Sequence, residues 1–567
     1  MKKPLEERKR ILLRLLLTVS AISIQFLQFQ VSIENVILRF FDLTLLLILI
    51  LRIPTRKQPV VFWLIGFLMS IPIVIYLVGR FREYWIYSAI PEKLAVLFHM
   101  STAGFLLCLG TAFSTVALFS CSFILARMIE VLIKSMYCSF KPLCCLLRKR
   151  FRPSLMIRML SFAFTRVLLC ATVGIAALTL ISSISSPSME EHMVSSAAEI
   201  EKGVIQFPVF SWSLDDFTDS IMLLSASEES EKPILERALL NYRGAHNDDD
   251  PLTVLREHYL RGVPFNRLAM YGRYWHGYRI TLRPLLVLTD YHGIRTLNTA
   301  VQFGLIILAC FLLRQHAKAL LLPFLATCLM LRPIETGLSL QYSSCFYVMI
   351  AGVLCLLIKK SNCNRYYANL FLYLGIATSF LDLLTWPIVT FGIPGVVLLY
   401  VCHTECEEEK LLMLIKAGLL WCIGYSGMWV SKWILGSLLT DVNIMANALP
   451  EIISRTGNTG ASGETISFLA CLDRNITGSC FAPAFPLLLF LIYRYLYHSK
   501  IYDASFIHIF PNTLLSLLPL FWYAFAMNHS YIHSFYTCRD LSVSAFAVLS
   551  GLSTLQSEAY TIYRATN

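Results

Sequence analysis

The chain has 567 residues, of which 56% are hydrophobic and 15% charged, and its formal net charge at pH 7 is +12. Soluble domains carry about 25% charged residues, so this composition excludes an ordinary soluble protein. Repeated apolar runs, each long enough to cross a hydrocarbon layer of about 30 Å, predict a polytopic membrane protein.

In chain order, residues 1–133 form an amino-terminal block with four predicted spans, near 11–29, 36–52, 59–79 and 98–126. A basic linker follows at 134–156. The remainder, 157–567, holds ten further predicted spans, near 157–184, 299–313, 317–333, 337–358, 366–383, 385–402, 411–434, 482–497, 506–525 and 541–557. We therefore predict an all-α polytopic membrane protein with about 14 transmembrane helices and a large, partly helical extracytoplasmic loop.

Lysine and arginine orient these spans, because short cytoplasmic loops carry the basic excess. If successive spans cross the membrane in alternating directions, all the main basic segments fall on the same side. These are MKKPLEERKR at the amino terminus, the linker at 134–156, RQHAK (314–318) and KKSNCNR (359–365). We expect a multi-pass protein of the plasma membrane with both termini cytoplasmic. The segments 185–298, about 435–481 and about 526–540 would then be external.

The segment 185–298 differs from the rest of the chain in charge. It holds 16 acidic residues and 11 lysines and arginines, a net charge of −5. The sequence predicts a helix around 190–203 and a helix start where Asp250 precedes Pro251. If residues 215–225 are helical, Asp215 and Asp219 lie four residues apart on one face. Any chemistry is expected mainly in this segment.

Three aspartates stand close together in the run SLDDFTD: Asp215, Asp216 and Asp219. One interpretation is catalytic: a carboxylate near the membrane surface deprotonates an acceptor hydroxyl, and a second carboxylate holds a divalent cation. The other is a helix start with Ser213 as the cap and acidic residues in the first turn. The sequence identifies no cofactor, and a divalent cation remains one option. No CxxC pair occurs, so we predict no zinc site.

Two further segments offer anion-binding side chains. Arginine forks match phosphate oxygens and aromatic rings stack on sugars or isoprenoid, although the same residues also anchor proteins at membrane surfaces. The predicted substrate-binding residues are Arg273, Trp275, His276, Tyr278 and Arg283 in YGRYWHGYRITLRP, and His529, His533 and Arg539 in NHSYIHSFYTCRD. His529 and His533 are four residues apart and would share one face of a helix.

The carboxy-terminal block, about 155–567, resembles the GT-C superfamily of integral-membrane glycosyltransferases. The resemblance lies in Asp215 and Asp216 within the first large external loop of this block, in the return to the membrane through RYWHGYRITLRPLL, and in the segments GLLWCIGYSGMWVSKWIL and NHSYIHSFYTCR. It implies transfer of a sugar from a polyprenyl-phosphate donor to an envelope glycan, lipid or protein acceptor at the extracytoplasmic face. Asp215 would be the base, assisted by Asp216 or Asp219.

Two other functions fit the sequence. An envelope polysaccharide polymerase or ligase would use external Arg and His on a lipid pyrophosphate-linked glycan and would need no carboxylate base. A lipid or polysaccharide transporter would need charged residues at mid-membrane, discontinuous helices and internal repeats. We expect no nucleic-acid partner, because the basic excess is explained by cytoplasmic loops that face anionic lipid.

Overall fold

The computed structural model describes residues 153–185, 187–200, 204–206, 211–246, 250–359, 364–402, 407–460, 463–480 and 510–566. The chain divides into two compact units, and all of these residues belong to the unit made of Phe140–Gln206, Ser211–Leu488 and Ile507–Asn567. The amino-terminal block, nearly all of the basic linker and the predicted span at 482–497 lie outside the described residues.

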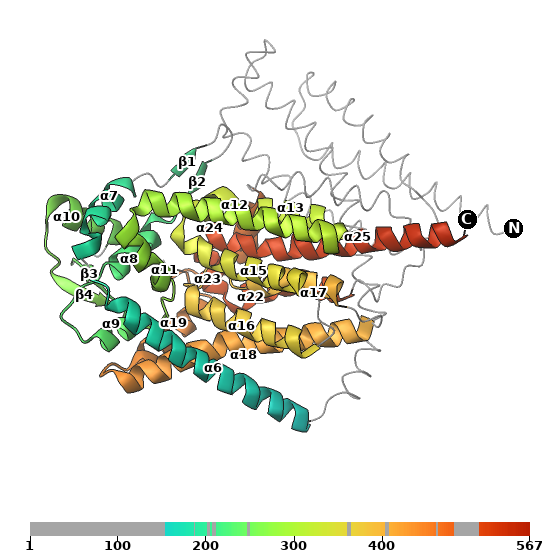
Figure 1. Ribbon diagram of the computed structural model, residues 1–567, viewed down its shortest axis with the longest axis horizontal. Coiled ribbons are helices and arrows are strands. Elements are labelled where there is room, and N and C mark those ends of the chain that lie inside the picture. Colours follow the sequence, from blue (N-terminus) through green and yellow to red (C-terminus); the bar gives the residue numbers. More distant parts are fainter. Residues whose placement is uncertain are drawn as a thin grey trace, which may run out of the picture. The chain divides into compact units, whose positions relative to one another are not determined.

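The described unit is a helical bundle with a smaller polar region at one end (Figure 1). The bundle helices are α6 (Pro153–Ser182), α12 (Tyr291–His316), α13 (Leu321–Met330), α15 (Leu340–Ile358), α16 (Asn364–Leu381), α17 (Val389–Val401), α18 (Glu407–Leu439), α22 (Phe510–Phe525) and α25 (Leu541–Thr566). Helix α16 packs along α18, α15 along α17, and α22 along α25.

Four helices of the described residues are long and apolar enough to cross a membrane: Ile157–Ser182, Tyr291–His316, Leu340–Ile358 and Glu409–Leu439. The prediction of about fourteen spans is therefore wrong: even in the part of the chain that the structure describes, several predicted spans are not long apolar helices. Five of the predicted spans, near 11–29, 36–52, 59–79, 98–126 and 482–497, lie outside it.

The predicted spans at 317–333 and 385–402 show why apolar length overestimates the number of spanning helices. The first contains α13, which has 10 residues and ends before the Arg332–Pro333 turn. The second contains α17, which has 13 residues because Asp382 accepts a hydrogen bond from Thr385 N and holds a turn ahead of it. At 1.5 Å per residue these helices are about 15 and 20 Å long, shorter than the hydrocarbon layer.

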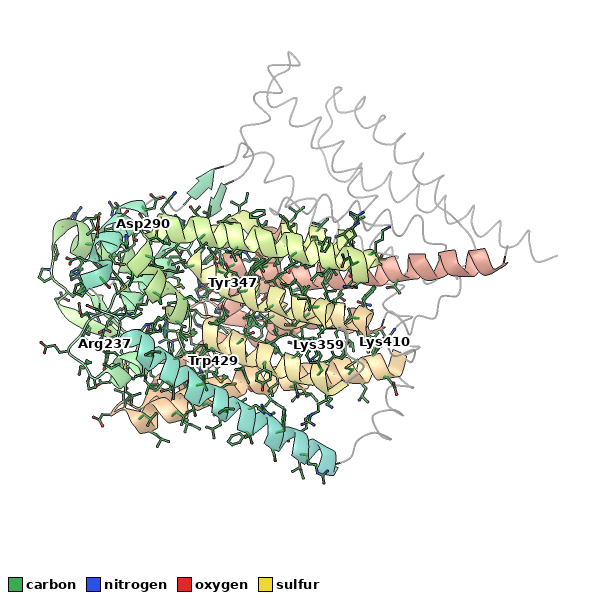
Figure 2. All side chains as sticks on the ribbon, viewed as in Figure 1. Arg237, Asp290, Tyr347, Lys359, Lys410 and Trp429 are labelled. Atoms are coloured by element: carbon green, nitrogen blue, oxygen red, sulfur yellow. The ribbon has the colours of Figure 1, made fainter. Side chains whose placement is uncertain are left out.

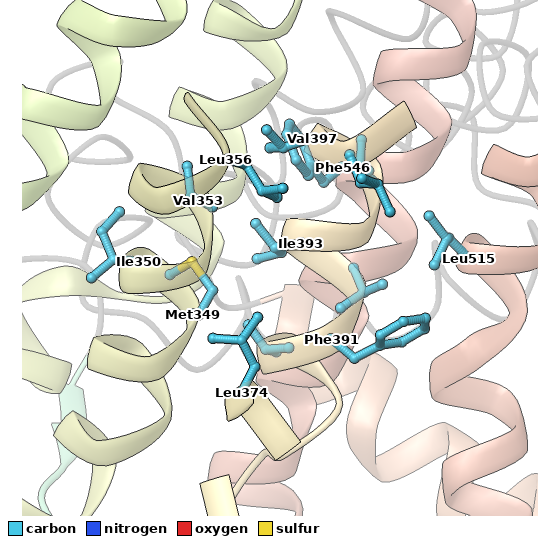
Figure 3. Close-up of a cluster of buried hydrophobic side chains, with 14 of the residues drawn as sticks. Met349, Ile350, Val353, Leu356, Leu374, Phe391, Ile393, Val397, Leu515 and Phe546 are labelled. Carbon is cyan, nitrogen blue, oxygen red and sulfur yellow. The ribbon is translucent and has the colours of Figure 1, made fainter. Parts of the chain in front are cut away.

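Helix α17 forms the centre of the apolar core. It packs against α15, α16, α18, α22 and α25, and nearly every one of its side chains is buried. Met349, Val353, Ile393, Val397 and Phe546 meet there (Figure 3). Because its outer surface is covered by other helices, α17 needs no polar face and is apolar all round.

Helices α16 and α18 approach closely through two glycines. A Cβ on Gly375 would lie 2.2 Å from Trp421 O, and a Cβ on Gly424 would lie 2.3 Å from Leu372 O. Small residues let helix backbones meet at such distances in membrane proteins. The pair therefore sets the spacing of these two helices.

The segment between α6 and α12 folds into short helices and two antiparallel hairpins. Its elements are α7 (Glu190–Glu199), β1 (Val204–Gln206), β2 (Ser211–Ser213), α8 (Asp216–Ala226), α9 (Ile234–Leu240), β3 (Tyr242–Ala245), α10 (Pro251–Arg261), β4 (Arg267–Met270) and α11 (Arg279–Leu288). Val204 pairs with Ser213 in one hairpin, and Tyr242 pairs with Met270 in the other. The predicted helix near 190–203 and the helix start at Asp250–Pro251 are confirmed. Helix α8 shows that the aspartate run does begin a helix.

The remaining short helices connect the bundle helices: α14 (Pro333–Leu338), α19 (Ile444–Thr456), α20 (Phe468–Cys480), α23 (Met527–Ile532), α24 (Ser534–Thr537) and the 3₁₀ turn η4 (Cys538–Asp540). Helix α14 contacts α12 and α15, and α19 contacts α18 and α23. In Figure 2, Arg237 and Asp290 lie toward one end of the bundle, and Lys359 and Lys410 lie toward the other. The helix connections that carry most of the predicted site residues gather at the end of Arg237 and Asp290.

Candidate functional site

Asp215 is the amino-terminal cap of α8. Its carboxylate accepts hydrogen bonds from Thr218 N at 3.0 Å and from Thr218 Oγ1 at 2.9 Å. Partial burial raises the pKa of the Asp215 carboxyl, and the two bonds from Thr218 oppose that rise. The capping role that the sequence offered as an alternative is therefore present, although Asp215 and not Ser213 is the cap.

Asp219 is completely buried and is bound on all sides by protein donors. It accepts from Tyr291 Oη at 2.5 Å, Leu340 N at 2.9 Å, Gln341 N at 3.0 Å and Ser339 Oγ at 3.3 Å. Burial raises the pKa of Asp219 to about 6 despite these bonds. Its carboxylate caps the start of α15 and ties α8 to α12, so this predicted catalytic residue acts as a structural link.

Of the three aspartates, Asp216 is the one whose carboxylate has an oxygen without a hydrogen-bond partner among the described residues. It is half-buried, and its Oδ1 is buried with no hydrogen-bond partner among the described residues. Burial first, and then the neighbouring charge of Asp219, raise the pKa of Asp216 to about 6, while Arg295 lowers it. A carboxylate with this pKa is mostly ionised at neutral pH and can still take up a proton from a reacting group.

A buried ion cluster lies at the ends of α13 and α24. Arg539 Nη2 is 2.9 Å from Glu335 Oε2, and Arg332 Nη1 is 3.3 Å from the same oxygen. The Arg539 guanidinium also lies 4.3 Å from the ring centre of Tyr342 and donates through Nε to Leu331 O at 3.2 Å. Arg332 adopts a left-handed backbone conformation with φ 55° at the start of α14. One carboxylate therefore faces two guanidiniums, which leaves the cluster with net positive charge.

A second chain of charges crosses from the β4–α11 connection through α19 to α24. Arg273 Nη2 is 3.8 Å from Glu451 Oε1, and Arg455 Nε is 2.8 Å from that oxygen. Arg455 Nη1 lies 2.7 Å from His533 Nε2. Burial, followed by the charge of Arg455, lowers the pKa of His533 to about 4. His533 is therefore neutral at pH 7, and Arg455 donates to its unprotonated Nε2.

Tyr536 connects these groups. Its ring stacks on His533 with centroids 5.2 Å apart, and it lies 6.0 Å from both the His529 ring and the Tyr342 ring. Asp215 is close enough that its charge, after burial, raises the pKa of the Tyr536 hydroxyl. Asp215, at the start of α8, therefore lies near the residues of α19 and α24 that surround Tyr536.

His529 lies in the same cluster, with its ring 4.9 Å from that of His533. It packs against the backbone of Leu384, and neither of its buried ring nitrogens makes a hydrogen bond of good geometry within the described residues. Burial and the nearby charges of His533 and Arg455 lower its pKa, so the ring is neutral. A neutral imidazole with open nitrogens can accept a proton or a hydrogen bond from a ligand.

Of the predicted residues, the structure brings together Asp215, Arg273, His529, His533 and Arg539, and Asp216 directly follows Asp215 in α8. We call this set, together with Arg332, Glu335, Glu451, Arg455 and Tyr536, the polar cluster. The other predicted substrate-binding residues make protein contacts away from it: Trp275 Nε1 donates to Met428 O at 2.8 Å, and Arg283 donates to Ala226 O at 2.6 Å and to Glu228 O at 3.1 Å.

His276 and Tyr278 also belong to the packing of the segment. His276 has φ 55°, and its Nε2 donates to Tyr271 O at 2.7 Å while its Nδ1 accepts from Tyr278 Oη at 3.1 Å. Burial lowers the pKa of His276, which keeps the ring neutral. These four side chains, from Trp275 to Arg283, fix the β4–α11 connection to the bundle.

Sequence reasoning missed Arg455, Glu451, Glu335 and Tyr536. The spacing of Glu451 and Arg455, four residues apart, was a signal for an ion pair on one helix face. Glu335 stands in LRPIETG beside Arg332, but nothing in the sequence indicated that Arg539 would join them. Within the described residues, no group of three or more His, Cys, Asp or Glu side chains is arranged to hold a metal ion.

Comparison of the chain with protein-family models, curated proteins and solved structures finds no match. Its fold and its polar cluster therefore carry the functional argument by themselves.

Proposed function

We propose that the chain is an integral-membrane glycosyltransferase of the GT-C type. It would move a sugar from a polyprenyl-phosphate donor to an envelope glycan, lipid or protein acceptor. The observation that carries this proposal is the approach of Asp215, whose charge reaches Tyr536, to the Arg273–Glu451–Arg455–His533 chain at one end of an apolar bundle. Asp216, with its unpartnered Oδ1, directly follows Asp215 in the first turn of α8. A carboxylate base beside cationic groups at a membrane surface is what transfer from a lipid phosphate requires.

The orientation of the bundle in the membrane is part of this proposal. Lys359 and Lys410 lie toward the end opposite Asp290 (Figure 2), and positive residues favour the cytoplasmic side. The polar cluster would then face the extracytoplasmic side, with both termini cytoplasmic in the plasma membrane. The donor's isoprenoid chain would remain in the bilayer, and its phosphate would reach the cluster.

In the proposed reaction, the acceptor hydroxyl loses its proton to the Asp216 carboxylate and its oxygen bonds to the anomeric carbon of the sugar. The bond between that carbon and the phosphate oxygen breaks, and polyprenyl phosphate leaves with the electron pair. Arg455 and Arg273 would stabilise the phosphate, because arginine forks pair with phosphate oxygens. Asp215 would shape the start of α8, and Arg539 would add positive potential from within its ion cluster.

Sugar transfer in membranes that contain the full chain tests the proposal. The probe is a radiolabelled polyprenyl-phosphate hexose, and the readout is label in acceptor material. Asp216→Asn should lower the rate by about a hundredfold or more, the usual size of a general-base effect. Glu229→Gln, at an exposed acid of the same segment, is the matched control and should retain the rate. An active Asp216→Asn variant would remove this residue from the mechanism.

One observation favours the polymerase or ligase as a second candidate. The carboxylates of Asp215 and Asp219 both accept hydrogen bonds from backbone N–H groups at helix starts. In contrast, the Arg455 and His533 side chains lie together. In that reaction Arg455→Gln and His529→Gln would abolish activity while Asp216→Asn would not. The same set of variants, assayed for glycan polymerisation from a lipid pyrophosphate-linked repeat unit, separates the two functions.

A further inference from the structure

Helix α19 has its polar and apolar sides reversed relative to a helix on the surface of a soluble protein. Its inward side carries Ile444, Ala448, Glu451 and Arg455, which follow the helical repeat. Ile444 and Ala448 are buried in the protein, and Glu451 and Arg455 bind Arg273 and His533. The charged groups of this helix therefore point into the protein.

The opposite side of α19 is apolar and uncovered. Ile453 is 73% exposed and Leu449 is 49% exposed, and the two are four residues apart on one face. Soluble helices place apolar residues inward and charges outward. Helix α19 does the reverse, as expected for a helix whose outer side contacts lipid.

Helix α18, which precedes α19 in the chain, carries an exposed apolar stripe of its own. Val430, Ile434 and Leu438 repeat every four residues on α18 and are exposed, Leu438 at 75%. They belong to the candidate membrane span Glu409–Leu439, so lipid is the natural neighbour of this stripe. Only four residues separate α18 from α19, and an open hollow of about 450 Å³ lies at that turn, lined by Leu438, Val442 and Met445 among others.

We propose that α19 is an interfacial helix whose Leu449–Ile453 face is embedded in the acyl region of the leaflet at the polar-cluster end of the bundle. The occupant of this face is bilayer lipid. An amphipathic helix that directly follows a membrane span lies in the interface plane with its apolar side in the acyl boundary. The inference rests on the exposed apolar faces and the candidate span, and it does not depend on the reaction proposed above.

The proposal gives α19 a positioning role for the polar cluster. Glu451 and Arg455 lie on the side away from lipid, and Arg455 is held 2.7 Å from His533. Embedding the outer face fixes the depth of the helix, and this sets the height of Arg455 relative to the phosphate plane of the leaflet.

Photochemical cross-linking of the full chain in vesicles tests the embedded face. A benzophenone amino acid is placed in turn at Ile453 and Leu449, the protein is reconstituted in phosphatidylcholine–phosphatidylglycerol vesicles, and lipid adducts are measured by mass spectrometry after irradiation. Phe164, 68% exposed on the candidate span of α6, is the positive control. Arg261, with a side chain 72% exposed on α10, is the control outside any candidate span.

We expect lipid adducts at 449 and 453 comparable to those at 164 and at least about fivefold above those at 261, because an interfacial helix buries its apolar side in the acyl boundary. Adducts at 164 without adducts at 449 and 453 would overturn the proposal. Cross-links between two copies of the chain at 453 would also overturn it, because a second protein and not lipid would then cover the face.

Discussion

The assignment of Asp219 as a structural link leads to a prediction that separates it from its neighbour Asp216. Asp219→Ala removes the acceptor for the Tyr291 hydroxyl and for the backbone N–H groups of Leu340 and Gln341. All three donors stay in a site that excludes water, because Asp219 and Tyr291 are fully buried. Asp216→Ala removes a half-buried carboxylate with one unpartnered oxygen.

Two opposing effects set the change in the free energy of unfolding for Asp219→Ala. Each buried donor left without an acceptor costs about 1–3 kcal/mol. Against this, the native state holds Asp219 with a pKa of about 6 instead of 3.8, and a rise of that size disfavours the ionised native state by roughly 3 kcal/mol at pH 7. The three donors together cost about 3–9 kcal/mol, so the net loss of stability for Asp219→Ala is roughly 0–6 kcal/mol with a central value near 3 kcal/mol. Asp216→Ala should be neutral or slightly stabilising.

The pH dependence has a definite sign. Because the folded pKa is raised, the folded state binds the extra proton, so Asp219 contributes most stability below pH 3.8 and loses that contribution as the pH rises through about 6. The difference between wild type and Asp219→Ala should therefore be larger at pH 5 than at pH 7, by about 1 kcal/mol.

Thermal unfolding of the purified protein in detergent, followed by tryptophan fluorescence, measures these differences. We expect Asp219→Ala to lower Tm by several degrees and Asp216→Ala to leave it unchanged. Equal Tm values for the two variants would show that Asp219 does not join α8 to α15, and the division of the aspartates between structure and chemistry would fail.

Three further predictions concern helix packing, the buried ion cluster and the pH dependence of activity. Gly375→Val should separate α16 from α18 and prevent stable folding, because its Cβ would lie 2.2 Å from Trp421 O. Gly304→Ala is the control and should fold normally, because no atom lies within 4 Å of the new Cβ. Size-exclusion profiles and Tm values distinguish the two variants. Arg539→Gln should lower stability by about 3–5 kcal/mol by leaving a buried charge cluster incomplete, while exposed Arg261→Gln should have little effect; unfolding in denaturant that gave equal losses would contradict the burial argument. Activity should rise about tenfold between pH 5 and pH 7 as the Asp216 carboxyl, with a pKa of about 6, ionises; the pH–rate profile checks this, and a flat profile would exclude Asp216 as the base.

Local rules in the sequence predicted several elements correctly. The helix over 215–225 and the helix start at Asp250–Pro251 follow from cap and first-turn preferences that involve residues a few positions apart. These features depend on neighbours in the chain, so the sequence contains the information directly.

Other expectations failed or remained open because they depend on residues far apart in the chain. Hydropathy predicted spans at 317–333 and 385–402, yet α13 and α17 are short because turns interrupt them. Arg283 looked like a phosphate ligand, but the carbonyl of Ala226, 57 residues away, takes its Nη1 donor. Arg455 was overlooked although it contacts His533, 78 residues away, because only the folded chain brings α19 to α24.

By itself, the sequence predicted a helical protein with candidate membrane-spanning segments, because apolar length and charge content are properties of the chain that need no partner. It offered a helix start at the aspartate run as one of two interpretations, with Ser213 as the cap. Only the tertiary structure decided which polar groups remain open for a ligand. Asp216 and His529 keep unpartnered atoms, whereas Asp219 and Arg283 are saturated by donors and acceptors that are distant in the chain. The physical reason is that the availability of a buried polar group depends on the partners that packing brings to it, and those partners are remote in sequence.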